Sequence, residues 1–299
     1  MYEQITRNRV KSLLLVLAVL VLAVGLGYVF GLLFEFGWGG AILALVIAAG
    51  MSIASYRYGD RLVLAVSRAR PATKEEHARL LNVVEGLTIA SGVPMPKVYV
   101  IPEQAPNAFA TGRNPEHASI AVTEGLLQVL NRVELEGVVA HELSHVKNRD
   151  ILVGTLVATL VGVVVLLADW TRRAFFWGGG RVGGRNKGLP IAGALLVVGL
   201  LLSILAPIGA QLIRLAVSRR REYLADADGA LMTRYPPGLA AALRKIAASP
   251  NQMRVANNAT AHLWLNQPSR VPGEGVSWFE RLFSTHPPIQ DRIRFLEEM

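Results

Sequence analysis

The stretch His-Glu-Leu-Ser-His at residues 141–145 has the residue types and the spacing of a metal site. On an α-helix, His141 and His145 lie one turn apart on the same face, so both imidazoles can turn a nitrogen toward one point. Glu142 lies slightly round the helix, where its carboxylate can take a proton from a water molecule at the metal. The pattern therefore predicts two zinc ligands and a general base, and a reaction in which a water molecule at the metal is activated.

A catalytic zinc site needs a third protein ligand and an open fourth position. The segment 218–228 contains Glu222 and Asp226 four residues apart on a predicted helix, so a ligand and an orienting carboxylate can share one face. We assign Glu222 to the metal, and Asp226 to the outer N–H of a ligand histidine. Two alternatives remain open: the roles of these two residues are exchanged, or Asp228 is used instead.

Three motifs together resemble one family of enzymes. They are His-Glu-Leu-Ser-His, the sequence Arg-Arg-Glu-Tyr-Leu-Ala-Asp about 80 residues later, and Ser-Thr-His-Pro-Pro at 284–288. The combination resembles the peptidase family that contains HtpX-type membrane zinc metalloproteases and the type I CAAX prenyl proteases. The length and the order of the apolar segments are more similar to the HtpX type. By this resemblance, the two histidines and Glu222 hold one zinc ion per chain, and Glu142 is general base and acid.

Two further polar residues become candidates through the same resemblance. Peptide hydrolysis needs a positioned donor for the tetrahedral oxyanion besides the metal. His286, in the Ser-Thr-His-Pro-Pro motif, matches a histidine that lies near the active site in the family, and Asn107 matches another polar position there. From the sequence alone, a histidine before two prolines is more often a turn or cap residue, and that alternative stays open.

The composition indicates a membrane protein. Of the 299 residues, 52% are hydrophobic, which is too apolar for an ordinary soluble domain but fits a membrane part plus one compact domain. The net charge is +9, and the basic residues cluster beside apolar runs, so we expect a lipid bilayer as partner and no nucleic acid. The chain has no cysteine, which excludes disulfides and thiol chemistry. Nothing in the sequence indicates an oligomeric state.

Four apolar runs are candidates for transmembrane helices, at 12–34, 36–56, 151–168 and 189–213. Basic residues before the first run place the N-terminus in the cytoplasm by the positive-inside rule: Arg7, Arg9 and Lys11. The third and fourth runs adjoin the two metal motifs, so the site should face the cytoplasm at the surface of the cell (inner) membrane. The loop between them is itself basic, which leaves a hairpin that does not cross as the alternative to four spans.

The expected fold class is an α-helical membrane protein, of about four transmembrane helices, with a small α+β zinc metallopeptidase (gluzincin-like) domain. We predict four parts: two transmembrane helices at 1–60, the first part of a cytoplasmic protease domain at 61–150, the third and fourth apolar helices at 151–217, and the second part of the protease domain at 218–299.

Within the soluble parts, the sequence predicts helices after Pro71, from Glu124 with Thr123 as its cap, from about Glu134, and over 236–248. Two short runs, 97–101 and 118–122, are typical of strands, and we expect them to form a small antiparallel sheet. Its outer strand could bind an extended peptide through main-chain hydrogen bonds; the alternative is a capping hairpin without substrate contact. The polar stretch 250–275 is expected to be a flap over the cleft.

Together these features predict a membrane zinc endopeptidase. The resemblance implies that its substrates are unfolded, misfolded or damaged membrane proteins and that its role is quality control. Two alternatives remain. One is the processing of prenylated C-termini, as in the CAAX proteases. The other is a non-catalytic scaffold or transporter with a structural metal, which would require four protein ligands.

Overall fold

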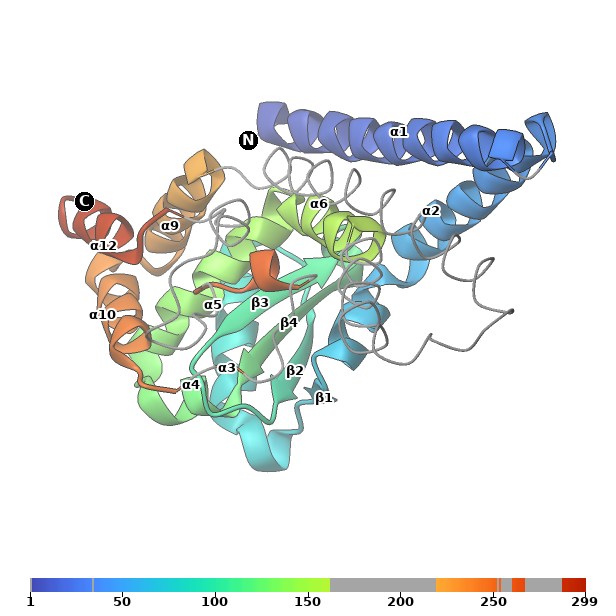
Figure 1. Ribbon diagram of the computed structural model, residues 1–299. Coiled ribbons are helices and arrows are strands. Elements are labelled where there is room, and N and C mark those ends of the chain that lie inside the picture. The colour runs from blue at the N-terminus through green and yellow to red at the C-terminus, as the bar shows by residue number, and fades with distance from the viewer. Residues whose placement is uncertain (1, 34, 162–218, 252, 254–259, 267–286) are drawn as a thin grey trace.

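The computed structural model describes residues 2–33, 35–161, 219–251, 253, 260–266 and 287–299. Two long helices, α1 (Tyr2–Leu33) and α2 (Trp38–Val66), form a hairpin that leads into the rest of the chain (Figure 1). Both are long and apolar enough to cross a membrane. They cover most of the first two predicted runs, 12–34 and 36–56; α1 begins ten residues before the first run and α2 ends ten residues after the second. The fourth run and the end of the third, residues 162–168, fall outside the described residues.

Glycines bring α1 and α2 into close contact. A Cβ on Gly27 would lie 2.5 Å from the Gly40 carbonyl oxygen, and a Cβ on Gly31 would collide with the backbone of Gly37. Small residues at such a crossing let two apolar helices approach closely where lipid provides no hydrophobic driving force between them.

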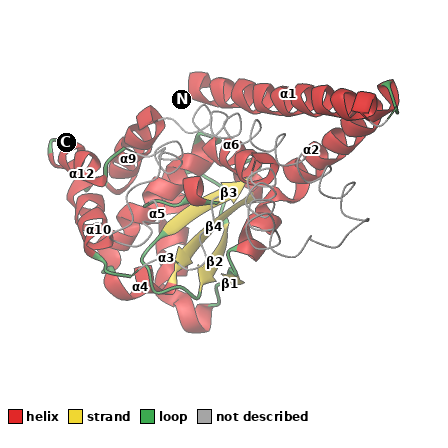
Figure 2. Ribbon diagram, viewed as in Figure 1, coloured by secondary structure: helices red, strands yellow, loops and turns green. Residues whose placement is uncertain are grey.

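A four-stranded sheet follows, in the order β1-β2-β4-β3 (Figure 2). The strands are β1 (Arg70–Pro71), β2 (Lys97–Ile101), β3 (Ala108–Gly112) and β4 (Ala118–Thr123). β2 and β4 are parallel neighbours, with Val98 opposite Ile120. β1 pairs antiparallel with β2, and β3 pairs antiparallel with β4 at an outer edge.

The prediction of an antiparallel pair at 97–101 and 118–122 is therefore wrong, although both strands exist. Parallel neighbours need a connection that brings the chain back to its starting end. Here the predicted loop 102–117 does so through β3, which runs back along the outer side of β4. The β3 sequence, Ala-Phe-Ala-Thr-Gly, is rich in small residues with weak strand propensity, so it resembles a loop.

Both faces of the sheet are buried. Successive side chains of a strand point to opposite faces. Accordingly, Val98 and Val100 pack in the larger core cluster with helices α3 (Lys74–Ser91) and α5 (Arg132–Lys147), while Ile101 and Phe109 pack in a second cluster with residues of α2 and with Trp264. This two-sided burial fixes the register of β3 and β4, because a shift by one residue would exchange the two sets.

The remaining helices that the structure describes are α3 (Lys74–Ser91), α4 (Glu124–Val129), α5 (Arg132–Lys147), α6 (Asp150–Leu156), α9 (Arg219–Thr233), α10 (Pro236–Ala248) and α12 (Ile289–Glu297), with short turns η1 (Pro115–His117), η2 (Val157–Val161) and η3 (Ala261–Leu263). Helices α3, α9 and α10 pack on α5, and α12 packs on α10. The Thr123 side chain accepts from the Leu126 N–H and so caps α4, as predicted. The predicted helix over 236–248 is likewise confirmed.

Helix α5 is the central element. A capping box of Asn131 and Glu134 begins it, two residues earlier than the sequence indicated. Its apolar side chains are completely buried, as their helical spacing predicted: Leu135, Val138, Val139, Leu143 and Val146. It ends at Lys147, where Arg149 adopts a left-handed conformation (φ 58°) and turns the chain into α6. The residues 141–145 thus lie in the buried part of a capped helix.

Candidate metal centre

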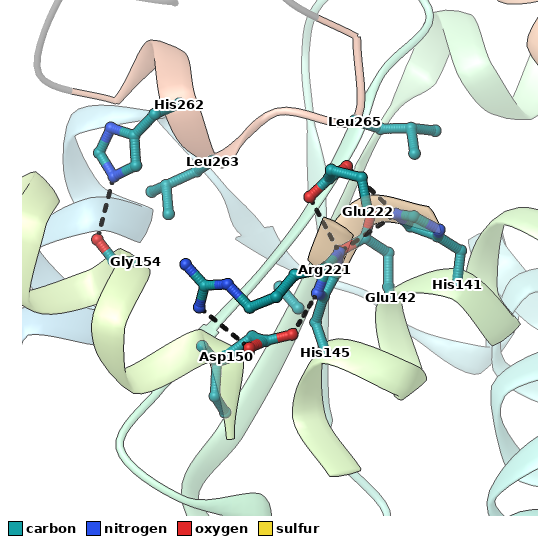
Figure 3. A pocket seen from close by; sticks show the side chains of 12 residues that line it. His141, Glu142, His145, Asp150, Gly154, Arg221, Glu222, His262, Leu263 and Leu265 are labelled. Carbon is teal, nitrogen blue, oxygen red and sulfur yellow. Dashed lines mark hydrogen bonds and ion pairs between the residues drawn. The ribbon is translucent and has the colours of Figure 1, made fainter. Parts of the chain in front are cut away.

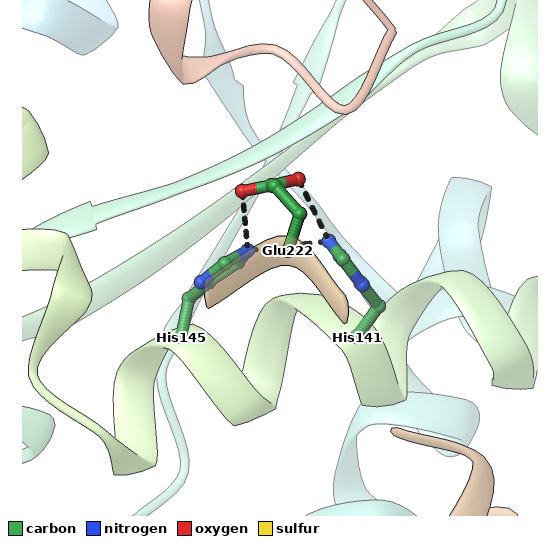
Figure 4. A group of neighbouring side chains, drawn as sticks. All are labelled: His141, His145 and Glu222. Atoms are coloured by element: carbon green, nitrogen blue, oxygen red, sulfur yellow. Dashed lines mark hydrogen bonds and ion pairs between the residues drawn. The ribbon is translucent and has the colours of Figure 1, made fainter. Parts of the chain in front are cut away.

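Three side chains from α5 and α9 converge on one point (Figure 4). The Nε2 atoms of His141 and His145 lie 3.2 Å apart. The Glu222 carboxylate faces both rings, with one oxygen 3.9 Å from Nε2 of His141 and the other 3.7 Å from Nε2 of His145. All three candidate ligand atoms lie within 4.8 Å of one another. The first two predicted ligands and the distant carboxylate are therefore brought together.

This donor set fits a zinc ion. Two ligand atoms at about 2.0–2.1 Å from a tetrahedral zinc are roughly 3.3 Å apart. The histidine pair has this separation, and the carboxylate oxygens are a few tenths of an ångström farther away. Two imidazoles and one carboxylate form the ligand set of catalytic zinc sites with an open fourth position. The group can therefore hold a metal ion.

A glycine allows α9 to pack against α5 at the site. Glu222, Asp226 and Gly229 lie four and three residues apart, so they share one face of α9. A Cβ on Gly229 would lie 2.9 Å from the backbone nitrogen of His141 and 3.1 Å from its Cα. The absence of a side chain at 229 is what brings both carboxylates within reach of His141.

His141 is oriented by a buried ion pair. Oδ1 of Asp226 lies 2.9 Å from Nδ1 of His141. Arg292 of α12 donates to both oxygens of Asp226, from Nε at 2.8 Å and from Nη2 at 2.6 Å. Burial acts to raise the pKa of Asp226, but Arg292 and His141 outweigh it and lower that pKa. Burial lowers the pKa of His141 itself, which favours the neutral imidazole that binds metal.

His145 has its own carboxylate, on the other side of the site (Figure 3). Oδ2 of Asp150 lies 3.1 Å from Nδ1 of His145, and Oδ1 of Asp150 accepts from Nη1 of Arg221 at 3.0 Å. Burial acts to lower the pKa of His145, but the bond to Asp150 and the charges of Glu222 and Glu142 raise it to about 9. The surroundings of this ring therefore favour positive charge, whether it is a proton or a metal ion.

A cavity of about 60 Å³ lies at the convergence point (Figure 3). Its lining includes Glu142, which is 2% exposed, together with the three candidate ligands. Ala110 of the edge strand β3 and Leu263 and Leu265 of the segment 260–266 also line it. The predicted base therefore lies in the same cavity as the ligands.

The segment 260–266 is the longest described part of the stretch 250–275, which the sequence predicted as a flap. Instead it is packed into the fold: Trp264 is completely buried, with its ring edge-on to Phe109 at 4.8 Å between centroids. The Leu265 N–H donates to the Ala108 carbonyl at 2.9 Å, on the outer side of β3. The segment thus covers one end of the edge strand beside the cavity.

The other predicted site residues lie elsewhere. Asn107 is buried at the start of β3 and is not among the residues that line the cavity; its amide bonds the backbone of Asn266, with Nδ2 donating to the carbonyl at 2.6 Å. Asp228, the alternative ligand, accepts from Asn148 at 2.9 Å and from Ser144 at 3.2 Å. These contacts place it outside the converging group. His286 lies outside the described residues.

Sequence reasoning missed three residues around the site. Asp150 had a local signal, because it directly follows the metal-binding helix five residues after His145. Arg221 had one too, as the neighbour of the proposed third ligand. Arg292 had none, because it lies about 150 residues from α5 between other charged residues.

Comparison with known proteins matches residues 74–299 to peptidase family M48. A protease HtpX homolog from Thermoanaerobacter pseudethanolicus is 44% identical over 299 residues, which cover 100% of this chain and 98% of that protein. One from Desulfatibacillum aliphaticivorans is 46% identical over 287 residues, covering 96% and 88%. Among solved structures, the crystal structure of S. mikatae Ste24p matches with a TM-score of 0.49 and 17% identity, over 99% of this chain and 67% of that one.

The sequence matches confirm the resemblance drawn from the three motifs, and with it the expected class, a membrane metalloprotease. The matched range contains both α5 and α9, which supply the converging side chains. The relatives also match the apolar N-terminal helices that precede this range. The chain therefore belongs to peptidase family M48.

Proposed function

We propose that this chain is a zinc endopeptidase of the membrane, with His141, His145 and Glu222 as the zinc ligands and Glu142 as general base and acid. The observation that carries the proposal is the convergence of the three ligands with Glu142 on one buried cavity, in a member of a peptidase family. One zinc ion per chain is expected.

Each side chain has a defined task in this mechanism. A bound zinc ion supplies Lewis acidity toward a water molecule and toward the carbonyl of the scissile peptide. The Glu142 carboxylate takes a proton from the attacking water and gives it to the leaving amine nitrogen. Asp226 and Asp150 accept the Nδ1–H bonds of His141 and His145, so each ring keeps the Nε2 lone pair for the metal.

The number of ligands favours catalysis over a structural metal. Within the described part of the chain, the converging group consists of two histidines and one glutamate. A structural zinc site closes four positions with protein ligands, whereas a catalytic site uses three and leaves one for water. This count argues against the alternative of a non-catalytic scaffold.

We propose that the substrate binds as an extended strand along the outer edge of β3. The Asn107 carbonyl accepts from the Thr123 N–H, so by the alternation of an antiparallel pair the backbone groups of Ala108, Ala110 and Gly112 point away from β4. Ala110 lines the cavity beside Glu142. A peptide held there by main-chain hydrogen bonds would be cleaved with broad sequence tolerance.

Part of this outer edge is already hydrogen-bonded within the protein. The Ala108 carbonyl already accepts from Leu265, and the Thr155 hydroxyl bonds both the N–H and the carbonyl of Gly112. Only the middle of the strand, at Ala110, faces the cavity without such a bond from the described residues. The strand that a peptide could extend is thus β3 and not one of the two predicted strands, 97–101 and 118–122, because both of these lie inside the sheet.

Two residues complete the proposed site. We keep His286 as the proposed donor to the oxyanion. Asn107 would act indirectly, because its amide holds Asn266 and with it the segment 260–266 that lines the cavity.

We further propose that the site faces the cytoplasm at the surface of the cell (inner) membrane. The metal centre touches α1 at Asn8, which lies between Arg7 and Arg9 at the basic end of the first apolar helix. The positive-inside rule keeps such an end in the cytoplasm. Unfolded or damaged membrane proteins as substrates, and a role in quality control, follow from the likeness to HtpX homologs.

The test is cleavage of an unfolded protein by the purified full-length chain with zinc. Glu142→Gln should lose activity by about 10²-fold or more while one zinc per chain remains bound. Glu136→Gln is the matched control, because it lies on the same helix in an ion pair with Arg132. Undiminished cleavage by Glu142→Gln would remove the mechanism. Internal cuts in an unprenylated substrate, read by mass spectrometry, would separate an endopeptidase from a CAAX-type enzyme.

A further inference from the structure

Asn8 of the first apolar helix reaches the metal centre directly. Its side chain is 2% exposed. Nδ2 donates to Oδ1 of Asp150 at 2.6 Å and to the Asn148 carbonyl at 2.9 Å, so both amide hydrogens are used. The two acceptors flank the left-handed residue at which the chain turns from α5 into α6. One amide group of α1 therefore ties down the turn from which Asp150 projects.

The same contact fixes the rotation of the Asp150 carboxylate. Oδ1 is held by two donors, Nδ2 of Asn8 and Nη1 of Arg221 at 3.0 Å. With Oδ1 held, Oδ2 faces Nδ1 of His145 at 3.1 Å. On the opposite side of that ring, Nε2 lies in the converging group with Glu222. A chain of contacts thus runs from α1 through Asp150 to the ligand nitrogen.

The two ligand histidines have parallel supports that differ in one respect. Each has a carboxylate at Nδ1, and each carboxylate is held by an arginine: Asp226 by Arg292, and Asp150 by Arg221. Arg292 makes two hydrogen bonds to both oxygens of its partner. Arg221 makes a single one, to Oδ1 of Asp150. The second donor to Asp150 is supplied by Asn8.

We infer that Asn8 is a positioning residue of the metal centre: it completes the hydrogen bonding of Asp150 and thereby orients His145. A membrane helix would then be part of the support of the catalytic site rather than an anchor alone. The inference rests on the proposed metal site. It predicts that the loss of the Asn8 amide weakens metal binding through Asp150, and not merely through a weaker fold.

The test uses the full-length protein in detergent, freed of metal and titrated with Zn²⁺ against a chelating dye. Asn8→Leu keeps the approximate volume but removes both donors, and it should weaken Zn²⁺ binding by about tenfold, the lower end of the effect of such outer contacts. Asn8→Asp, which places a second carboxylate beside Asp150, should weaken it further. The visible absorption spectrum of the Co²⁺-loaded protein should change in both variants, because it reports ligand geometry without any turnover.

A double-mutant cycle separates positioning from general stability. If Asn8 acts through Asp150, Asn8→Leu should have little further effect on the Zn²⁺ affinity of an Asp150→Asn protein. Ser12→Ala is the matched control: Ser12 lies one turn farther along α1, and its hydroxyl donates to the Asn8 carbonyl within the helix, its one hydrogen bond among the described residues. This variant should bind Zn²⁺ like the wild type. Unfolding of the metal-free proteins measures how much each substitution destabilises the fold itself, apart from its effect on Zn²⁺ binding.

The outcomes are distinct. Unchanged affinity and spectrum in Asn8→Leu, or an effect that adds fully to that of Asp150→Asn, would overturn the inference. If Asn8→Leu does not fold, the Zn²⁺ affinity and the Co²⁺ spectrum of Asn8→Asp test the inference in its place. A wild-type protein that binds no Zn²⁺ would instead contradict the proposed function.

Discussion

Arg292 and Asp226 form a buried ion pair at the back of the metal centre, joined by two hydrogen bonds of 2.8 and 2.6 Å. Arg292 also donates to the Leu265 carbonyl at 3.1 Å, so it connects the support of His141 to the segment beside β3. Burial acts to lower the pKa of Arg292, but the carboxylates of Asp226, Glu222 and Glu142 outweigh it and raise that pKa. The guanidinium is therefore charged at every working pH.

Replacing Arg292 by methionine should destabilise the protein strongly. It would leave Asp226 as a buried carboxylate without its cation, and removing one partner of a buried pair costs about 3–5 kcal/mol. The measurement is the free energy of unfolding in denaturant. Arg294→Met is the control, because Arg294 is exposed on the same helix in an ion pair with Asp291. Equal stability of the two variants would show that the buried pair contributes nothing.

Gly229→Ala should separate α9 from α5. The added methyl would press on the backbone of His141, and overpacking of this kind costs about 1–3 kcal/mol. Because α9 carries Glu222, zinc affinity should fall together with stability. Gly86→Ala is the control: Gly86 is exposed in α3, and apart from its own helix backbone no atom of the described residues lies within 4 Å of an added Cβ, so this change should stabilise by about 0.5–1 kcal/mol. If Gly229→Ala changed neither the stability nor the zinc affinity, tight packing of α9 against His141 would be refuted.

Zinc affinity should rise with pH up to about pH 9. The raised pKa means that His145 of the metal-free protein holds an extra proton below about pH 9. A metal ion must displace that proton, so affinity should increase about tenfold per pH unit and then level off. The sign for the metal-free fold is opposite: its stabilisation by this proton is complete below about pH 6.5 and is lost toward pH 9.

Competition with a chelator between pH 6.5 and 9.5 measures this dependence. In Asp150→Asn the largest favourable contribution to the pKa of His145 is reduced, so the levelling point should move to lower pH. A flat profile in the wild type would contradict the environment described for His145.

Removal of zinc should lower the unfolding midpoint. A ligand that binds only the folded state at 1,000 times its dissociation constant stabilises by about 4 kcal/mol. Thermal unfolding in detergent, with and without chelator, measures the shift, and added zinc should restore it. Glu222→Gln, with one ligand weakened, should show a much smaller shift. A midpoint that does not respond to chelator in the wild type would argue against a metal that joins α5 to α9.

The sequence was informative where chemistry depends on local geometry. A spacing of four residues places His141 and His145 on one face of a helix whatever surrounds it, and the same holds for Glu222 and Asp226. The burial of α5 followed from its apolar spacing. The convergence of the two helices is not local, and it was anticipated through the resemblance to a family.

Features that depend on distant contacts were missed. β3 consists mainly of small residues, and only its pairing with β4 makes it a strand. That pairing also decides that β2 and β4 are parallel. Arg292 lies between charged neighbours in α12, and nothing near it in sequence indicates a buried position. Asn8 and Asp150 lie far apart in the sequence, and no helix or strand periodicity relates such distant positions, so their contact could not be predicted.

The hydrogen bond from Leu265 to Ala108 has a consequence for turnover on the proposed binding mode. An incoming peptide that extends along β3 must exchange an internal bond for an external one, and such an exchange contributes little net free energy. The 60 Å³ cavity is also far below the few hundred cubic ångströms of a typical ligand pocket. On that binding mode, the segment 260–266 would have to move before a peptide could pair along the whole outer side of β3, because its own backbone already occupies the hydrogen-bonding position at Ala108.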